Sequence, residues 1–312
     1  MSIDMKDAIT FDYETFLDWT LKLKDTGSAE PLYKKDKIDC HGDYLLPSDY
    51  FDDLSNLIKE YSDSRKIATI NRTKTHAVFF KYDTNDVAEF IAENEEYPET
   101  TANDWTRYKV QVNKLGTIIK VDYEKVYDKE YNVTPVIIDK FAHAFAVAED
   151  KAFILGSGNK QPIGILNAEK GAEIGLTAAS KEAITYDEIV DLYFSLDKKY
   201  RKNACFIMND KTACALRKVV DSTGNHIYND NKDTILGKPV VIFNDMPDIG
   251  EGSTPVAFGD YSYYHFFIIK DVYIKPLKEL YTLEEQVGYR GYERLDGVLS
   301  KQDAVKLIKM AE

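Results

Sequence analysis

The sequence has few cysteines, and their spacing suits neither a disulfide framework nor a zinc site. Only Cys40, Cys205 and Cys214 occur in 312 residues, and none stands in a Cys-x-x-Cys pair. Such sparse use is typical of a chain kept in a reducing compartment. No apolar run approaches the roughly 20 residues that span a bilayer, and the N-terminus lacks the pattern of a signal peptide. We therefore expect a protein made in the cytosol, with no membrane segment.

Excess positive charge is also lacking. The chain carries 40 Lys and Arg against 53 Asp and Glu, a formal net charge of -13. Binding to nucleic-acid phosphates needs a positively charged surface, so this excess of acidic residues argues against a protein whose main function is to bind DNA or RNA. Aromatic residues are abundant instead, with 22 Tyr and 15 Phe. Tyr is enriched at protein interfaces, although drift in composition explains the same count.

Motifs of catalytic and cofactor-binding sites are missing. The sequence has no Gly-x-Ser-x-Gly elbow, no His-Glu-x-x-His pair and no Gly-x-Gly-x-x-Gly opening a helix. The stretch GSGNKQPIG has the glycines of a phosphate loop, but it follows a helix and would face the negative end of the helix dipole. Gly156 and Gly158 are therefore interpreted as helix C-cap residues. The five histidines are scattered, and we expect no catalytic residue, no cofactor and no metal site.

The N-terminal third is predicted to contain an arm and a long ribbon. Amphipathic helices are expected around 13–24 and 49–62, separated by polar, turn-rich sequence. From 66 to about 122 apolar and polar residues alternate, which is typical of half-buried strands. Residues 83–104, between those strands, hold eight acids and no base. Because an isolated two-stranded ribbon is marginally stable in water, we expect support from outside its own subunit.

The longest predicted helix covers NVTPVIIDKFAHAFAVAEDKAFIL and ends at the two glycines. Its apolar face recurs at steps of three and four residues. After it, short helices and strands alternate without a strict βαβ rhythm, and one helix opens with a capping box of Thr185 and Glu188. The predicted class is α+β.

The order of these features resembles a known family. Five segments occur in the order and spacing of tailed-bacteriophage major capsid proteins of the Hong Kong 97 type, namely AENEEYPET, EDKAFILGSGNKQPIGIL, CFIMNDKTACALRKVVDSTGNHIY, TILGKPVVIFNDMP and AFGDYSYYHFFIIK. The resemblance covers residue 42 to the end. A single piece is a weak signal, whereas five in the right order are specific.

The resemblance implies the Hong Kong 97-like capsid fold and a role for each region. The regions would be an N-terminal arm (1–65), an extended E-loop β-ribbon (66–122), a peripheral domain with a long spine helix (123–161), an axial domain (162–260), a return strand of the peripheral domain (261–283) and the C-terminal part of the axial domain (284–312). The implied site residues are a subunit interface at the E-loop tip (Glu93, Glu95, Glu96, Tyr97, Glu99), a spine-helix core (Ile137, Phe141, Phe145, Ala148) and a domain corner (Gly156, Gly158).

The implied function is that of a major capsid protein, not an enzyme. Copies would assemble into pentamers and hexamers of an icosahedral shell that encloses double-stranded DNA without sequence-specific binding. Assembly would occur in the host bacterial cytoplasm, with a portal protein and a decoration protein as further partners, and the product would be the virion. Two alternatives stay open, an encapsulin-like bacterial compartment of the same fold and an unrelated soluble enzyme.

Two departures from the family pattern carry expectations of their own. The chain starts at Met1 with no long scaffolding segment before the arm, so either a separate scaffolding protein drives assembly or an upstream segment is absent from this sequence. Some relatives join subunits by an isopeptide bond between an E-loop lysine and a late asparagine. Here residues 83–104 contain no lysine, and no asparagine follows Asn244, so that bond is expected to be absent.

Overall fold

Two compact units make up the chain, each built from three separated segments. Unit 1 comprises residues 1–61, 116–146 and 271–293, and unit 2 comprises 62–115, 147–270 and 294–312. The computed structural model describes residues 48–73, 78–82, 90, 105–127, 133–220, 224, 226–229, 233–277 and 279–312. Helices and strands alternate through both units, which confirms the predicted α+β class.

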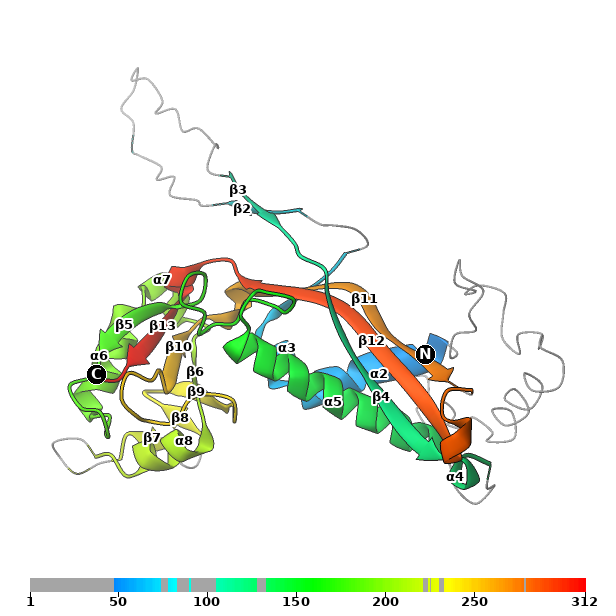
Figure 1. The fold of residues 1–312 in the computed structure, drawn as a ribbon. Helices are drawn as coiled ribbons and strands as arrows, with labels where there is room; N and C mark the ends of the chain where they lie inside the picture. Colours follow the sequence, from blue (N-terminus) through cyan, green and yellow to red (C-terminus); the bar gives the residue numbers. More distant parts are fainter. Residues whose placement is uncertain are drawn as a thin grey trace, which may run out of the picture. The chain divides into compact units, whose positions relative to one another are not determined.

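A seven-stranded sheet forms the centre of unit 2 (Figure 1). Its strands lie in the order β5 (Glu173–Thr177), β13 (Val305–Lys309), β10 (Val256–Gly259), β6 (Cys205–Met208), β9 (Lys238–Ile242), β8 (Thr234–Ile235) and β7 (Tyr228–Asn229). Side chains alternate between two buried clusters because successive residues of a strand point to opposite faces. Phe206 and Met208 join one cluster, and Cys205 and Ile207 join the other.

Three short helices pack in the first of these clusters, and side chains cap the N-termini of two of them, α6 and α8. They are α6 (Tyr186–Ser195), α7 (Lys198–Arg201) and α8 (Asp210–Arg217). The predicted capping box of α6 is confirmed, since Thr185 accepts from the backbone N–H of Glu188 and Glu188 accepts from that of Thr185. At α8 the Asn209 side chain accepts from the Thr212 backbone N–H at 2.7 Å, a single cap bond without a reciprocal partner. Each cap satisfies N–H groups that the first helical turn leaves unpaired.

The second cluster forms around the C-terminal half of α5 (Val133–Leu155). The Phe153 ring is fully buried and packs edge-on against Tyr264, with ring centroids 4.6 Å apart. It also contacts Phe243, Tyr261 and Phe266. This aromatic group fixes the end of α5 on the sheet of unit 2.

A four-stranded sheet has the order β1 (Thr69–Arg72), β11 (Tyr264–Leu277), β12 (Gln286–Leu299) and β4 (Asn113–Asp122). In unit 1, Phe141 of α5 is fully buried against β12. A Cβ atom at Gly291 would lie 2.6 Å from the Phe141 ring, so only glycine permits this approach. Unit 1 also contains α2 (Ser48–Tyr61), α4 (Tyr123–Tyr127) and a 3-10 turn at Thr282–Glu284, and unit 2 has further 3-10 turns at Tyr261–Tyr263 and Gln302–Ala304.

The paired ribbon is shorter than the long two-stranded ribbon expected over 66–122. Only β2 (Val78–Tyr82) and β3 (Trp105–Lys109) pair as an antiparallel ribbon, with Phe79 opposite Tyr108. Before them, a short helix α3 (Asp63–Ile67) leads into β1, which pairs in parallel with β11. Residues 110–112 are irregular and interrupt the predicted strand before β4 begins. The two ends of the expected ribbon thus belong to the four-stranded sheet.

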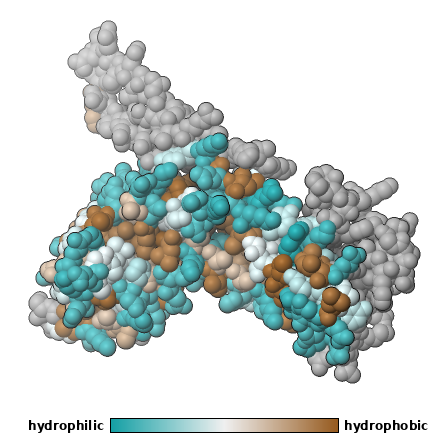
Figure 2. All heavy atoms as spheres, in the orientation of Figure 1, coloured by the Kyte–Doolittle hydropathy of each residue, from teal (hydrophilic) through white to brown (hydrophobic). Residues whose placement is uncertain are grey.

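Exposed apolar side chains occur among the polar ones. In the space-filling view, brown apolar residues interrupt the teal surface in several places (Figure 2). Large apolar residues exposed by two fifths or more include Val147 and Leu155 on α5, Ile174 on β5, Phe194 on α6, and Leu280 and Leu283 between β11 and β12. Single exposed apolar side chains are ordinary at protein surfaces. Such a residue bears on function only where a second structural feature lies beside it.

Candidate functional site

Among the residues that the structure describes, no group of three or more His, Cys, Asp and Glu is placed to hold a metal ion. Within the same residues, no helix is long and apolar enough to cross a membrane. Cys205 is buried, and burial raises the pKa of its thiol to about 12. A thiol of that kind stays protonated and unreactive.

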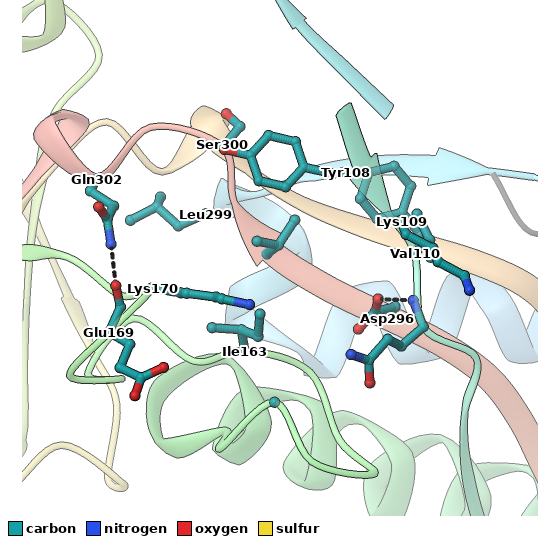
Figure 3. Close-up of a pocket in the computed structure, with 14 residues that line it drawn as sticks. Tyr108, Lys109, Val110, Ile163, Glu169, Lys170, Asp296, Leu299, Ser300 and Gln302 are labelled. Carbon is teal, nitrogen blue, oxygen red and sulfur yellow. Dashed lines mark hydrogen bonds between the residues drawn. The ribbon is translucent and has the colours of Figure 1, made fainter. Parts of the chain in front are cut away.

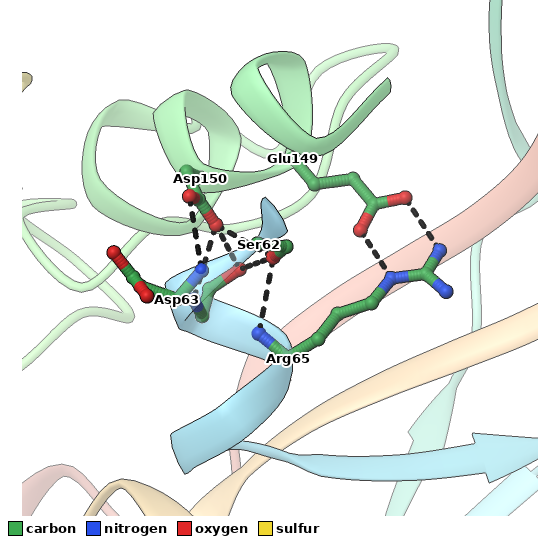
Figure 4. Close-up of polar contacts among 6 residues, drawn as sticks. Ser62, Asp63, Arg65, Glu149 and Asp150 are labelled. Atoms are coloured by element: carbon green, nitrogen blue, oxygen red, sulfur yellow. Dashed lines mark hydrogen bonds and ion pairs between the residues drawn. The ribbon is translucent and has the colours of Figure 1, made fainter. Parts of the chain in front are cut away.

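A buried ion pair ties the start of unit 2 to α5 (Figure 4). The Arg65 guanidinium donates through Nε and Nη2 to the two carboxylate oxygens of Glu149, at 2.5 and 2.6 Å. The two side chains are only 4% and 1% exposed. Two parallel bonds of this type fix orientation as well as distance, so the pair sets where α3 lies along α5.

The neighbouring carboxylate of Asp150 holds the N-terminus of the same short helix (Figure 4). Asp150 accepts from the hydroxyls of Ser62 and Ser64, at 2.7 and 2.6 Å, and from the backbone N–H groups of Asp63 and Ser64, at 3.2 and 3.0 Å. These donors include backbone groups that the first turn of α3 leaves unpaired. Two consecutive acids of α5 thus position the segment that leads into β1.

A third carboxylate fixes the link between β3 and β4. Asp296 of β12 accepts from the Gln111 backbone N–H at 2.6 Å, from the Asn113 side-chain amide at 3.0 Å and from the Gly297 N–H at 2.9 Å. Burial raises the pKa of the Asp296 carboxyl to about 6, although the hydrogen bonds act in the opposite direction. Because Asp296 takes the Gln111 N–H, the backbone leaves the strand at residues 110–112.

A cavity of about 490 Å³ lies beside this link (Figure 3). Its wall includes Tyr108 and Lys109 from β3, Ile163 from the loop after α5, and Asp296 and Leu299 from β12. Across the cavity, the Gln302 amide donates to the Glu169 carbonyl at 2.9 Å. Apolar and polar groups mix along the wall, and no catalytic constellation appears among them.

The glycine loop that raised the question of phosphate binding is a tight reversal. The Gly156 N–H donates to the Ala152 carbonyl, and a Cβ atom at Gly156 would lie 2.2 Å from the Pro162 carbonyl oxygen. Gly158 has a φ of +77°, which favours glycine. The chain then returns along the end of α5, where Ile165 donates to the Phe153 carbonyl. Both glycines lie within unit 2.

A second cavity, of about 380 Å³, lies along the C-terminal half of α5 in unit 2. We call it the lysine pocket, because Lys114, Lys151 and Lys160 line it. Among the described residues that line it, Glu149 is the one acid, and its carboxylate binds Arg65. Its apolar wall consists of Leu115, Ala148, Ala152, Leu155, Pro162 and Leu295.

The structure places the residues singled out from the sequence as follows. Ile137, Phe141 and Phe145 are buried in unit 1, and the two phenylalanine rings lie 6.2 Å apart. Ala148, expected in the same core, is half-buried and lines the lysine pocket instead. The predicted E-loop tip lies outside the described residues (Glu93, Glu95, Glu96, Tyr97, Glu99).

Sequence reasoning missed the polar contacts of unit 2. Glu149 had a detectable signal, since it continues the four-residue steps of Phe141 and Phe145 on the buried side of α5. A charged residue in an apolar register indicates a buried partner. Asp296 and Lys160 had no such signal.

Comparisons with known proteins agree with this architecture. The family model described as the phage capsid family matches residues 42–310. No curated protein matches the chain.

Solved capsid structures share the fold. The capsid of the native GTA particle is 24% identical, with a TM-score of 0.68 over 93% of this chain and 99% of that one. The capsid of the empty GTA particle has the same identity and a TM-score of 0.71, over 93% and 98%. A chain of Gordonia phage Cozz is 13% identical, with a TM-score of 0.59 over 80% and 87%. These findings favour a phage capsid over an encapsulin-like compartment, and the chain belongs to the phage capsid family.

Proposed function

We propose that this major capsid protein of a phage assembles into pentamers and hexamers of a closed icosahedral shell around double-stranded DNA. The observation that carries the proposal is the family match over residues 42–310, almost the whole chain. The ribbon of β2 and β3 supports it, because these strands form a sheet of only two strands. Such a ribbon gains stability when a second surface covers it.

The regions are proposed to keep the roles that the family resemblance gives them. The arm (1–65) and the E-loop (66–122) would bind neighbouring copies, with Glu93, Glu95, Glu96, Tyr97 and Glu99 at the contact. Phe141 and Phe145 would hold the spine helix on the peripheral domain. The burial of both rings against unit 1 supports that assignment.

The role is proposed to be structural, without catalysis. Partners would be further copies, a scaffolding protein, a portal protein and a decoration protein. Assembly would take place in the bacterial cytoplasm before the shell becomes part of the virion. Enclosure of DNA needs no sequence-specific contact, and the net charge of -13 is compatible with a shell that does not grip its contents.

Assembly is the direct test. The chain is expressed alone and with a scaffolding protein, and the products are examined by sedimentation and negative-stain microscopy. Closed particles of uniform size are expected, because contacts distributed over large areas stabilise shells. A stable monomer in the presence of the scaffolding protein would refute the proposal.

A further inference from the structure

Charge is distributed unevenly along this acidic chain. Residues 105–121 contain four bases and no acid, and residues 151–168 contain two bases and no acid, although the formal net charge of the whole chain is -13. The two stretches are separated in the sequence, yet both line the lysine pocket, through Lys114 from the first and through Lys151 and Lys160 from the second. Folding therefore gathers positive charge at one place in unit 2.

The acids nearest to these lysines on α5 are already bound by other groups. The carboxylate of Glu149, in the pocket wall, accepts two hydrogen bonds from Arg65. The next residue, Asp150, accepts from backbone N–H groups at the start of α3. Lys151 and Lys160 are exposed, and neither forms an ion pair with a carboxylate in the described part of the chain. Their ammonium groups are therefore open to an anion from outside the subunit.

Local structure does not account for the lysines. Cations in the last turn of a helix compensate its dipole, but the last turn of α5 contains no basic residue. Lys160 has a φ of +57°, in the left-handed region that residues other than glycine rarely adopt. Side chains held in such a conformation are frequent at functional sites. A lysine at this position in the glycine loop is thus explained better by what its side chain binds than by the turn.

The apolar wall of the pocket suits the lysines themselves. Lysine side chains bury their aliphatic stems along apolar surface while the ammonium group stays in water. Leu115, Leu155 and Leu295 provide such surface in the same wall. The three cations come from β4, α5 and the glycine loop, so they are presented as separate point charges. Lysine binds phosphate groups as a point charge of this kind.

We propose that the lysine pocket binds phosphate groups of the enclosed double-stranded DNA. This inference rests on the proposed function, because the filled shell is what brings DNA to the chain. DNA carries one negative charge per about 1.7 Å of helix axis, so several phosphates lie within reach of one pocket. The contact is independent of base sequence, since phosphates carry no sequence information. One weak site in each copy holds DNA locally, while the acidic remainder of the chain repels it.

Binding of a fluorescent DNA duplex of mixed sequence tests the proposal. The full-length, unassembled protein is titrated against the duplex at several sodium chloride concentrations, and fluorescence anisotropy gives the binding constant. Each phosphate contact adds about 0.9 to the slope of log binding constant against log salt, so Lys151→Gln with Lys160→Gln should lower the slope by about 1.8. A fourfold rise in salt should then weaken parental binding about twelve times more than binding by the variant. Lys151→Arg with Lys160→Arg keeps the charge and should keep the parental slope.

The matched control neutralises two exposed lysines of unit 2 outside the pocket, Lys198→Gln with Lys202→Gln. The net charge changes equally, and this control should keep the parental slope. Equal losses for the two pairs would overturn the inference, because the effect would then be one of net charge. Displacement of the duplex by an equal concentration of inorganic phosphate would assign the pocket to the free ion. Tighter binding of poly-glutamate than of the duplex would assign it to an acidic protein segment, and either result would overturn the inference too.

Filled particles provide a second, independent readout. Formaldehyde treatment followed by mass spectrometry should find DNA adducts on peptides that contain Lys151 or Lys160. Filled particles that lack these adducts would overturn the inference and leave the shell intact. Failure of the parent chain to form particles would instead refute the proposed shell itself.

Discussion

Loss of the Glu149 charge is expected to destabilise unit 2 strongly. Glu149→Gln keeps the size of the side chain but leaves the Arg65 guanidinium, only 4% exposed, facing a neutral amide. The two bonds at 2.5 and 2.6 Å then become one, since an amide carries a single acceptor oxygen.

The magnitude follows from the burial of both partners. Removing one member of a buried pair leaves an uncompensated charge, which lowers the free energy of unfolding by about 3–5 kcal/mol. Because the glutamine oxygen still accepts one bond, we expect the lower end, about 3 kcal/mol. A slope of about 3 kcal/mol per molar urea for a chain of this size converts that loss to a shift of about 1 M in the unfolding midpoint.

Urea unfolding of the unassembled subunit, followed by circular dichroism, is the assay. The matched control is Lys66→Met, which removes the 2.7 Å pair with Asp63, where the side chains are 49% and 42% exposed. Exposed pairs contribute about 0–1 kcal/mol, so this midpoint should move by less than about 0.3 M. Equal shifts for the two variants would refute the reasoning that burial determines the effect.

Four further outcomes are expected. Burial raises the folded-state pKa of Asp296 to about 6, so the stabilisation that comes from its protonated form is fully present below pH 4 and is lost as the pH rises through 6. The urea unfolding midpoint should therefore decrease from pH 4 to pH 7, and Asp296→Asn should reduce this decrease. Gly291→Ala should destabilise unit 1 by about 1–3 kcal/mol through collision with Phe141, whereas Gly250→Ala, where a Cβ meets nothing within 4 Å, should cost little, and equal thermal midpoints would contradict this. Boiling mature shells in detergent should release a single band near 35.7 kDa, and a reductant-resistant ladder would disprove the absence of covalent bonds. When four acids of the E-loop tip are replaced together by glutamine (Glu93, Glu95, Glu96, Glu99), shells should be less stable than the parent at low salt and equally stable at high salt. Equal stability at every salt concentration would show that the acidic tip is solvated and makes no contact that stabilises the shell.

Local features of this fold could be predicted from the sequence. The capping box of α6 depends on residues three apart, Thr185 and Glu188, and it forms as expected. The long helix α5 ends at Leu155, immediately before Gly156, because apolar periodicity and a glycine stop are both short-range signals. The capsid fold was indicated by the resemblance of five sequence segments, in their order and spacing, to a known family.

Long-range pairing could not be predicted in the same way. Thr69 lies opposite His265 in the parallel pair of β1 and β11, and neither strand contains a sequence signal that identifies its partner. Val110 and Val112 continue the alternation of β3, yet Asp296, 185 residues after Gln111, accepts a hydrogen bond from the Gln111 backbone N–H between them. The lysine pocket combines β4, α5 and the glycine loop, so its charge is visible only after folding.

The position of β13 has a consequence for the timing of assembly. This strand, Val305–Lys309, is synthesised almost last, yet it lies inside the seven-stranded sheet between β5 and β10. Its parallel partner Glu173–Thr177 leaves the ribosome more than a hundred residues earlier. The sheet of unit 2 therefore cannot close until translation is nearly finished, because an interior strand is missing until then. Chains cut short by premature termination would expose two unpaired sheet edges. Proteolysis would degrade such chains before they could be incorporated into a growing particle.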